Sequence, residues 1–114
     1  MTQKICLLSL PLLAAGPIAA YTCVGADGKT AAAGADAQGV AIFDAAAGDL
    51  VTTDVLGTTI VRAASAVTGG GRVQVGADGG VAPVTTGIPV GRALEAADAG
   101  ALVEMFIFQG AQAA

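Results

Sequence analysis

The sequence GRALEAADAGALVEMFIF, residues 91–108, decides the fold because part of it occurs twice in the chain. Residues 39–48 read GVAIFDAAAG, and Gly, Ala, an aliphatic residue, Ala, Ala and Gly recur in register 52 positions later. Upstream, VGADG at 24–28 is repeated without change at 75–79. A repeat of this length is typical of a duplicated supersecondary unit. Two copies are too few for a solenoid, so we expect two similar halves that close on each other.

The pattern around the repeats is that of short strands separated by turns. Residues 72–75 alternate cleanly, residues 102–108 are the most convincing strand, and Asp-Gly pairs supply the positive φ of tight turns. We expect a further turn at Gly57, between two strands. The predicted strands are 21–24, 29–33, 40–43, 50–55, 58–63, 72–75, 81–85, 92–97 and 102–108. Together they predict an all-β fold, a small barrel or sandwich with an internal two-fold-like duplication and an extended apolar N-terminal arm.

The N-terminal segment is the longest uncharged part of the chain, running from Ile5 to Ala26. We expect an ordered arm over residues 1–17 that packs on a partner or a neighbouring subunit, a β-domain over 18–110 and a C-terminal tail over 111–114. A basic residue followed by an apolar run is also typical of a signal peptide, although the small-residue pattern of a cleavage site is poor in this segment. The segment is also long enough for a membrane anchor, but Pro11, Gly16 and Pro17 argue against a membrane-spanning helix.

The composition predicts a weak core and no nucleic-acid surface. The chain is 54% hydrophobic but only 4% aromatic, and Ala together with 17 Gly supplies the excess. Alanine buries little area, so we expect self-association to add stability. The net charge of −4 and five scattered cations argue against DNA or RNA as a partner. We expect Cys6 and Cys23 to be buried, inert thiols in preference to a disulfide.

No motif for catalysis or for a cofactor is present. Histidine is absent, and neither Ser9 nor Ser65 lies in GxSxG. The Gly-rich run at 68–71 lacks the spacing and the lysine of a phosphate loop. Asp27 and Asp78 have no ligand-rich loop around them, so they are interpreted as turn formers and not as a calcium site. We expect the remaining strand-end acids to be solvated: Asp44, Asp49, Asp54, Glu95, Asp98 and Glu104. The sequence thus predicts no enzyme, no metal and no cofactor.

The C-terminal strand differs from its repeat partner by its bulk apolar side chains. Val103, Met105 and Ile107 fill one face, and Leu102, Glu104, Phe106 and Phe108 fill the other. Both faces are largely apolar, so both should be buried. One face can meet the core of this subunit, and the other needs a partner. The candidate interface residues, from the apolar arm and this strand, are Ile5, Leu7, Leu8, Leu10, Leu12, Leu13, Met105, Phe106, Ile107 and Phe108.

Three runs in this order resemble the capsid cement, or head-decoration, proteins of tailed bacteriophages. They are AAAGDLVTTDVLGTTIVRAA (45–64), GRVQVGADGGVAPV (71–84) and GRALEAADAGALVEMFIF (91–108), and the resemblance covers roughly residues 16 to 108. It implies a β-rich structural subunit, usually a homotrimer, on the exterior of an icosahedral head. Its partner would be the major capsid protein, whose subunit contacts it would clamp. The family offers no site residues to carry over.

Two other functions are weighed against this one. A secreted or periplasmic β-domain would follow from the signal-like N-terminus. A lipoyl- or biotin-carrier module shares the small duplicated β-fold and a Gly-Asp-x-Val element, which Gly48–Val51 matches. Such a carrier needs a modifiable lysine at a hairpin tip, and the two lysines here, Lys4 and Lys29, lack that context.

Overall fold

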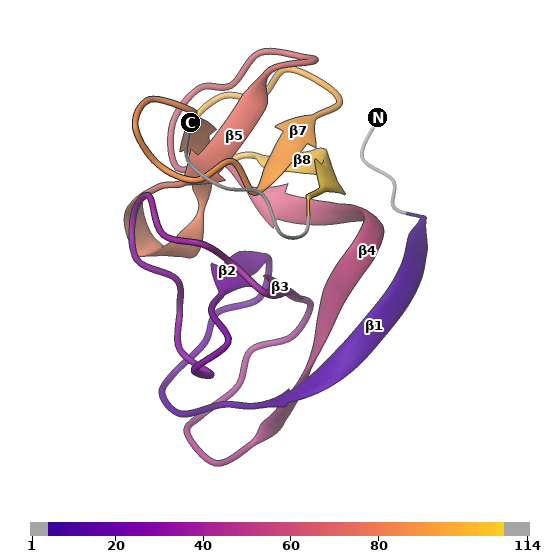
Figure 1. Cartoon of the computed structure of the whole chain (residues 1–114), viewed down its shortest axis with the longest axis vertical. Helices are drawn as coiled ribbons and strands as arrows, with labels where there is room; N and C mark the ends of the chain where they lie inside the picture. The colour runs from indigo at the N-terminus through magenta and orange to yellow at the C-terminus, as the bar shows by residue number, and fades with distance from the viewer. Residues whose placement is uncertain (1–4, 109–114) are drawn as a thin grey trace.

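The computed structural model describes residues 5–108 and shows an all-β chain, as the sequence predicts. Eight strands form one sheet of order β2-β3-β4-β8-β7-β5-β6, with β1 paired to β4 off this path. A parallel bridge between Ala63 and Val81 links the end of β4 to β6, so the sheet nearly closes into a barrel (Figure 1). The elements are β1 (Cys6–Leu13), β2 (Thr22–Val24), β3 (Gly39–Ala41), β4 (Leu50–Arg62), β5 (Arg72–Val75), the 3-10 turn η1 (Ala77–Gly79), β6 (Val81–Pro83), β7 (Gly91–Ala93) and β8 (Leu102–Ile107).

Most predicted strands are present, although several are shorter than expected. The strand at 72–75 is β5, and the last strand is β8, one residue shorter than predicted. The strand predicted at 29–33 is wrong, because only Thr30 pairs there, in a single bridge to Val24. The segment 92–97 is extended only as far as Ala93. The Asp-Gly turns hold, since Gly28 and Gly79 have φ of 81° and 80°.

The turn predicted at Gly57 is wrong, because the chain continues through this residue as one 13-residue strand, β4. Gly57 has a φ of 95°, and a Cβ there would collide with the carbonyl oxygen of Ile5. β1 lies against this point, since Cys6 pairs with Gly57. The glycine therefore serves a close backbone approach and a change of direction within the strand, and it does not reverse the chain.

The two halves of the chain share strand order and pairing register, with β4 divided between them. In the first half, β1 pairs with the first part of β4, and Leu13 lies opposite Leu50. In the second half, the second part of β4 pairs with β8, and Arg62 lies opposite Leu102. Likewise β3 lies on β4 as β7 lies on β8, in the pairs Ala41–Thr53 and Ala93–Met105. The internal duplication that the repeated sequence predicts stays a prediction.

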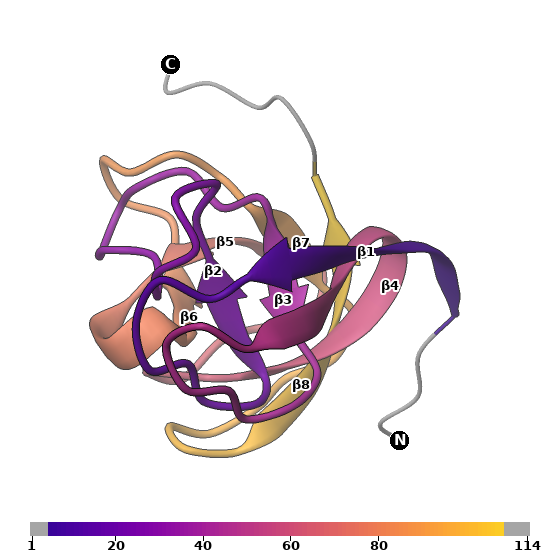
Figure 2. The ribbon, with the colours of Figure 1, turned by 90° about the horizontal axis from the view of Figure 1, so that it is seen from below.

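The apolar N-terminal segment is not a separate extension over the residues that the structure describes. Cys6–Leu13 forms β1, an edge strand that runs antiparallel along β4 (Figures 1 and 2). The structure therefore does not confirm an arm that leaves the domain. Residues 1–4 of the predicted arm and the predicted tail at 111–114 lie outside the described residues. Within residues 5–108, no helix has the length and hydropathy needed to cross a membrane.

Two apolar clusters fill the interior. The larger lies mainly within the second half, with Met105 at 1% exposure, and the smaller lies within the first half. The larger cluster contains Cys23, Ala31, Ala37, Val40, Val61, Val67, Val73, Val75, Val81, Val90, Ala93, Val103, Met105 and Ile107. The smaller contains Ala14, Ile18, Val24, Ala41 and Val51. Small and β-branched residues dominate both, in keeping with the Ala-rich composition.

The glycine that opens each repeat is required by close contact with the neighbouring strand. A Cβ on Gly91 would lie 2.5 Å from Met105 Sδ and 2.6 Å from the Phe106 carbonyl oxygen. A Cβ on Gly39 would lie 2.6 Å from the carbonyl oxygen of Asp54, the residue that corresponds to Phe106. The first residue of each repeat is therefore glycine for the same steric reason.

Substituting Gly91→Ala should destabilise the fold, because the added methyl group must displace Met105 and the β8 backbone. Overpacking of this kind costs about 1–3 kcal/mol in the free energy of unfolding, measurable by urea denaturation. Gly69→Ala is the matched control, since a Cβ there meets nothing closer than 3.6 Å, and it should change stability by no more than about 0.5 kcal/mol. Equal effects of the two substitutions would contradict the packing argument.

Candidate functional site

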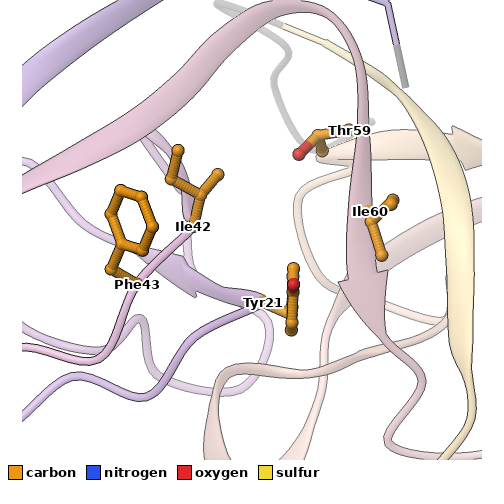
Figure 3. Close-up of a pocket in the computed structure, with 5 residues that line it drawn as sticks. All are labelled: Tyr21, Ile42, Phe43, Thr59 and Ile60. Carbon is orange, nitrogen blue, oxygen red and sulfur yellow. The ribbon is translucent and has the colours of Figure 1, made fainter. Parts of the chain in front are cut away.

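No arrangement of side chains in the described part of the chain resembles a catalytic or metal centre. No group of three or more His, Cys, Asp or Glu residues there is placed to hold a metal ion. A hollow of about 280 Å³ lies between the two halves, lined by Tyr21, Ile42, Phe43, Thr59 and Ile60. Ile42 and Phe43 line one side of it, while Tyr21, Thr59 and Ile60 line the other (Figure 3). Its side-chain walls are apolar apart from the hydroxyl groups of Tyr21 and Thr59, so it offers contact area and no carboxylate or basic group.

The candidate residues near the N-terminus lie on or beside β1 and are mostly exposed. Leu7 is the most exposed of them at 70%, while Leu12 is half-buried against the smaller core. The exposed candidates are Ile5, Leu7, Leu8, Leu10 and Leu13. Soluble single chains rarely leave so many large apolar side chains exposed along one edge strand, so this region remains a candidate interface.

The candidate residues near the C-terminus divide between core and surface. Met105 and Ile107 are buried in the larger core and are not accessible in a single chain. Phe106 is 46% exposed, and Phe108 is half-buried. Their rings meet edge to face, with centroids 6.2 Å apart. The surface contribution of this strand therefore comes from the face that carries Phe106.

Strand pairing adds exposed leucines that sequence reasoning missed. Leu50, at 73% exposure, pairs with Leu13, and Leu56 pairs with Leu8. We use the name β1 surface for these residues of β1 and β4: Ile5, Leu7, Leu8, Leu10, Leu13, Leu50 and Leu56. Only the pairing with β1 brings Leu50 to the candidate residues. Phe43, Leu94 and Leu102 are also exposed but lie outside this surface.

Asp54 is a second feature that sequence reasoning missed, and the prediction that it is a solvated acid is wrong. Its exposure is 0%, and it lies in β4 just before the change of direction at Gly57. Its carboxylate accepts hydrogen bonds from Ser9 Oγ at 2.9 Å, Cys6 Sγ at 3.2 Å and Thr59 Oγ at 2.8 Å. A buried carboxylate must be hydrogen-bonded to be tolerated, and these donors join β1 to both parts of β4.

Comparison with known proteins identifies the family. The family model described as phage cement protein matches residues 3–107. The chain belongs to the phage cement protein family. The crystal structure of the N base of head fiber gp8.5 from bacteriophage phi29 is similar in sequence and fold. It has 28% identity and a TM-score of 0.73 over 89% of this chain and 93% of that one. No curated protein matches in sequence.

Membership in the phage cement family agrees with the composition of the molecule's surface. The chain is a structural protein of a phage head and a component of the virion. Its notable surface features are exposed apolar strands, and its family is defined by a structural role and not by a reaction. The resemblance drawn from the order of the three sequence runs is thus confirmed.

The two cysteines of this cement protein are free and lie in different environments. Cys23 is buried in the larger core as predicted, and burial raises the pKa of its thiol to about 12. Cys6 is only half-buried and contacts Asp54, so the prediction that both thiols are buried is wrong for Cys6. Cys6 differs because β1 is an edge strand.

The buried Cys23 thiol should make stability fall in alkaline solution. The folded state keeps the thiol neutral up to a pKa of about 12, whereas the unfolded chain ionises it near its usual pKa of about 8.5. The buried neutral thiol therefore makes its full contribution to the free energy of unfolding below the pKa of the unfolded chain, and this contribution is lost as the pH rises above that value. By about pH 10 the wild type should lose about 2 kcal/mol more than Cys23→Ala does, relative to each protein at neutral pH.

Urea denaturation across this pH range measures the difference, with Cys6→Ala as the control that should follow the wild type. Parallel pH dependence of the wild type and Cys23→Ala would show that the thiol is not held neutral in the folded state.

Proposed function

We propose that this protein binds the outer surface of an icosahedral phage head and cements contacts between major capsid subunits. The observation that carries the proposal is the β1 surface, a set of exposed apolar side chains on a member of the phage cement family. The bacteriophage phi29 protein that it resembles is named as part of a head fiber, which agrees with a position on the head exterior.

The physical mechanism is burial of apolar area. Apolar surface removed from water contributes about 25 cal/mol per Å², so a row of leucines can supply most of the adhesion. The strand holds these side chains in a fixed geometry, so little conformational entropy is lost on binding. Many copies on one shell multiply a modest affinity per contact. No catalysis is needed for this role.

Self-association, as a homotrimer, is part of the proposal. The core of one chain consists largely of Ala and Val, and apolar side chains such as Phe43 are exposed outside the β1 surface. A sister subunit that covers such side chains would supply the burial that the small domain lacks. The β1 surface then stays available for the major capsid protein.

The double substitution Leu7→Asn and Leu13→Asn should weaken binding to empty heads at least about tenfold, because re-exposing one leucine contact costs on the order of 1.5 kcal/mol. Cosedimentation of purified protein with heads that lack it measures the dissociation constant. Both side chains are mostly exposed, so the free energy of unfolding should change by no more than about 0.5 kcal/mol.

Leu94→Asn is the matched control, because Leu94 is exposed outside the β1 surface. It should bind heads like the wild type. Full binding by the double variant would exclude the β1 surface as the contact. Binding of the wild type only to disrupted heads would contradict the exterior position.

A further inference from the structure

A row of side chains on the outward face of the second half carries an unusual pair of charges. Arg72 of β5 pairs directly with Arg92 of β7, Arg92 pairs with Phe106 of β8, and Phe106 pairs with Thr58 of β4. Directly paired residues point to the same face of a sheet. Figure 1 shows these four strands side by side in the upper part of the molecule. We call these four residues the arginine row.

The rows on either side confirm the direction in which the arginine row points. On one side lie Val73, Gly91 and Ile107, all buried. On the other side lie the buried residues Ala93, Met105 and Thr59. By alternation, the row between them projects outward, and Arg72, Arg92 and Phe106 are indeed exposed.

The two arginines occupy directly paired positions on neighbouring strands, on the outward face of the sheet. Like charges placed directly opposite in a sheet are destabilising. The chain has only five cations and a net charge of −4, so two arginines of those five in direct register stand out against an acidic protein. Such an arrangement costs stability in the free chain and is relieved by an anion from outside.

We propose that the arginine row docks a carboxylate-bearing segment of the major capsid protein. Arginines at directly paired positions can each present guanidinium donors to one ligand, and such donors match the planar geometry of Asp or Glu carboxylates. Phe106, next in the row, supplies an apolar contact for the residue adjacent to that acid. This inference rests on the proposed function and names the chemistry of one contact within it.

The chemistry favours a protein acid over the other anions. A nucleic acid needs a broad basic surface, and the row offers two cations within an acidic chain. A segment of the major capsid protein that presents one or two acids beside an apolar residue needs only these two cations and Phe106.

The test is the full-length double variant Arg72→Glu with Arg92→Glu, measured by cosedimentation with heads over a range of salt concentrations. Wild-type binding should weaken as salt rises, because the contact is charged. The double variant should bind at least about tenfold more weakly at low salt and lose most of that salt dependence. Arg62→Glu is the matched control, since Arg62 is exposed at the end of β4, outside the row, and it should behave like the wild type.

Several outcomes would overturn the inference. Wild-type affinity of the double variant would exclude the arginine row while leaving the cement function intact. Failure of the wild type itself to bind heads would defeat both proposals. Light scattering that shows a changed oligomeric state in the double variant would assign the row to a second copy. Loss of wild-type binding after nuclease treatment of the heads would assign it to nucleic acid.

Discussion

The rest of the structure depends on the pairing of β4 with three other strands. Over Leu50–Val55 this strand lies beside β1 and β3, and over Thr58–Arg62 it lies beside β8. Because one continuous strand belongs to both halves, neither half can move without changing the backbone of the other. The change of direction occurs at Gly57, where only a glycine can accept both the positive φ and the nearby backbone of β1. The buried Asp54 next to it links β1 to both parts of the strand.

This constraint explains how a small Ala-rich domain presents adhesive surfaces. β1 has no partner strand other than β4 among the described residues, so its leucines keep their position through that pairing, the Asp54 hydrogen bonds and the packing of Leu12 on the smaller core. The same strand positions β8, whose inward face fills the larger core and whose outward face carries Phe106. The two surfaces are thereby fixed on one body. A protein of the phage cement family that works by burying area needs this kind of rigidity.

Local sequence patterns predicted much of the fold. The alternation at 72–75 predicted β5 to the residue, and the bulk of residues 102–108 indicated a strand with a core face and a second apolar face. The repeat predicted that Gly39 and Gly91 occupy corresponding positions. These features depend on periods of two residues or on direct repetition, which can be seen in a linear sequence.

Features that depend on pairing between distant residues could not be predicted. Gly57 was interpreted as a turn because a glycine between two apolar runs is typical of one. The residues next to it in sequence do not indicate that β1 lies against it. Asp54 was interpreted as solvated because its donors Ser9 and Cys6 are 45 and 48 residues away. Leu50 was not among the candidate residues, because its pairing with Leu13 requires the register of β1 on β4. The candidate surface was therefore found in part, and its extent required the fold.

The most direct measurement of the central claim is hydrogen–deuterium exchange of the protein free and bound to phage heads. If the apolar strands are the contact, head binding should slow exchange in β1 and in the adjoining first part of β4. The turns around Asp27 and Asp98 should exchange at the same rate in both states. Protection confined to those turns, with β1 exchanging equally in both states, would contradict the account.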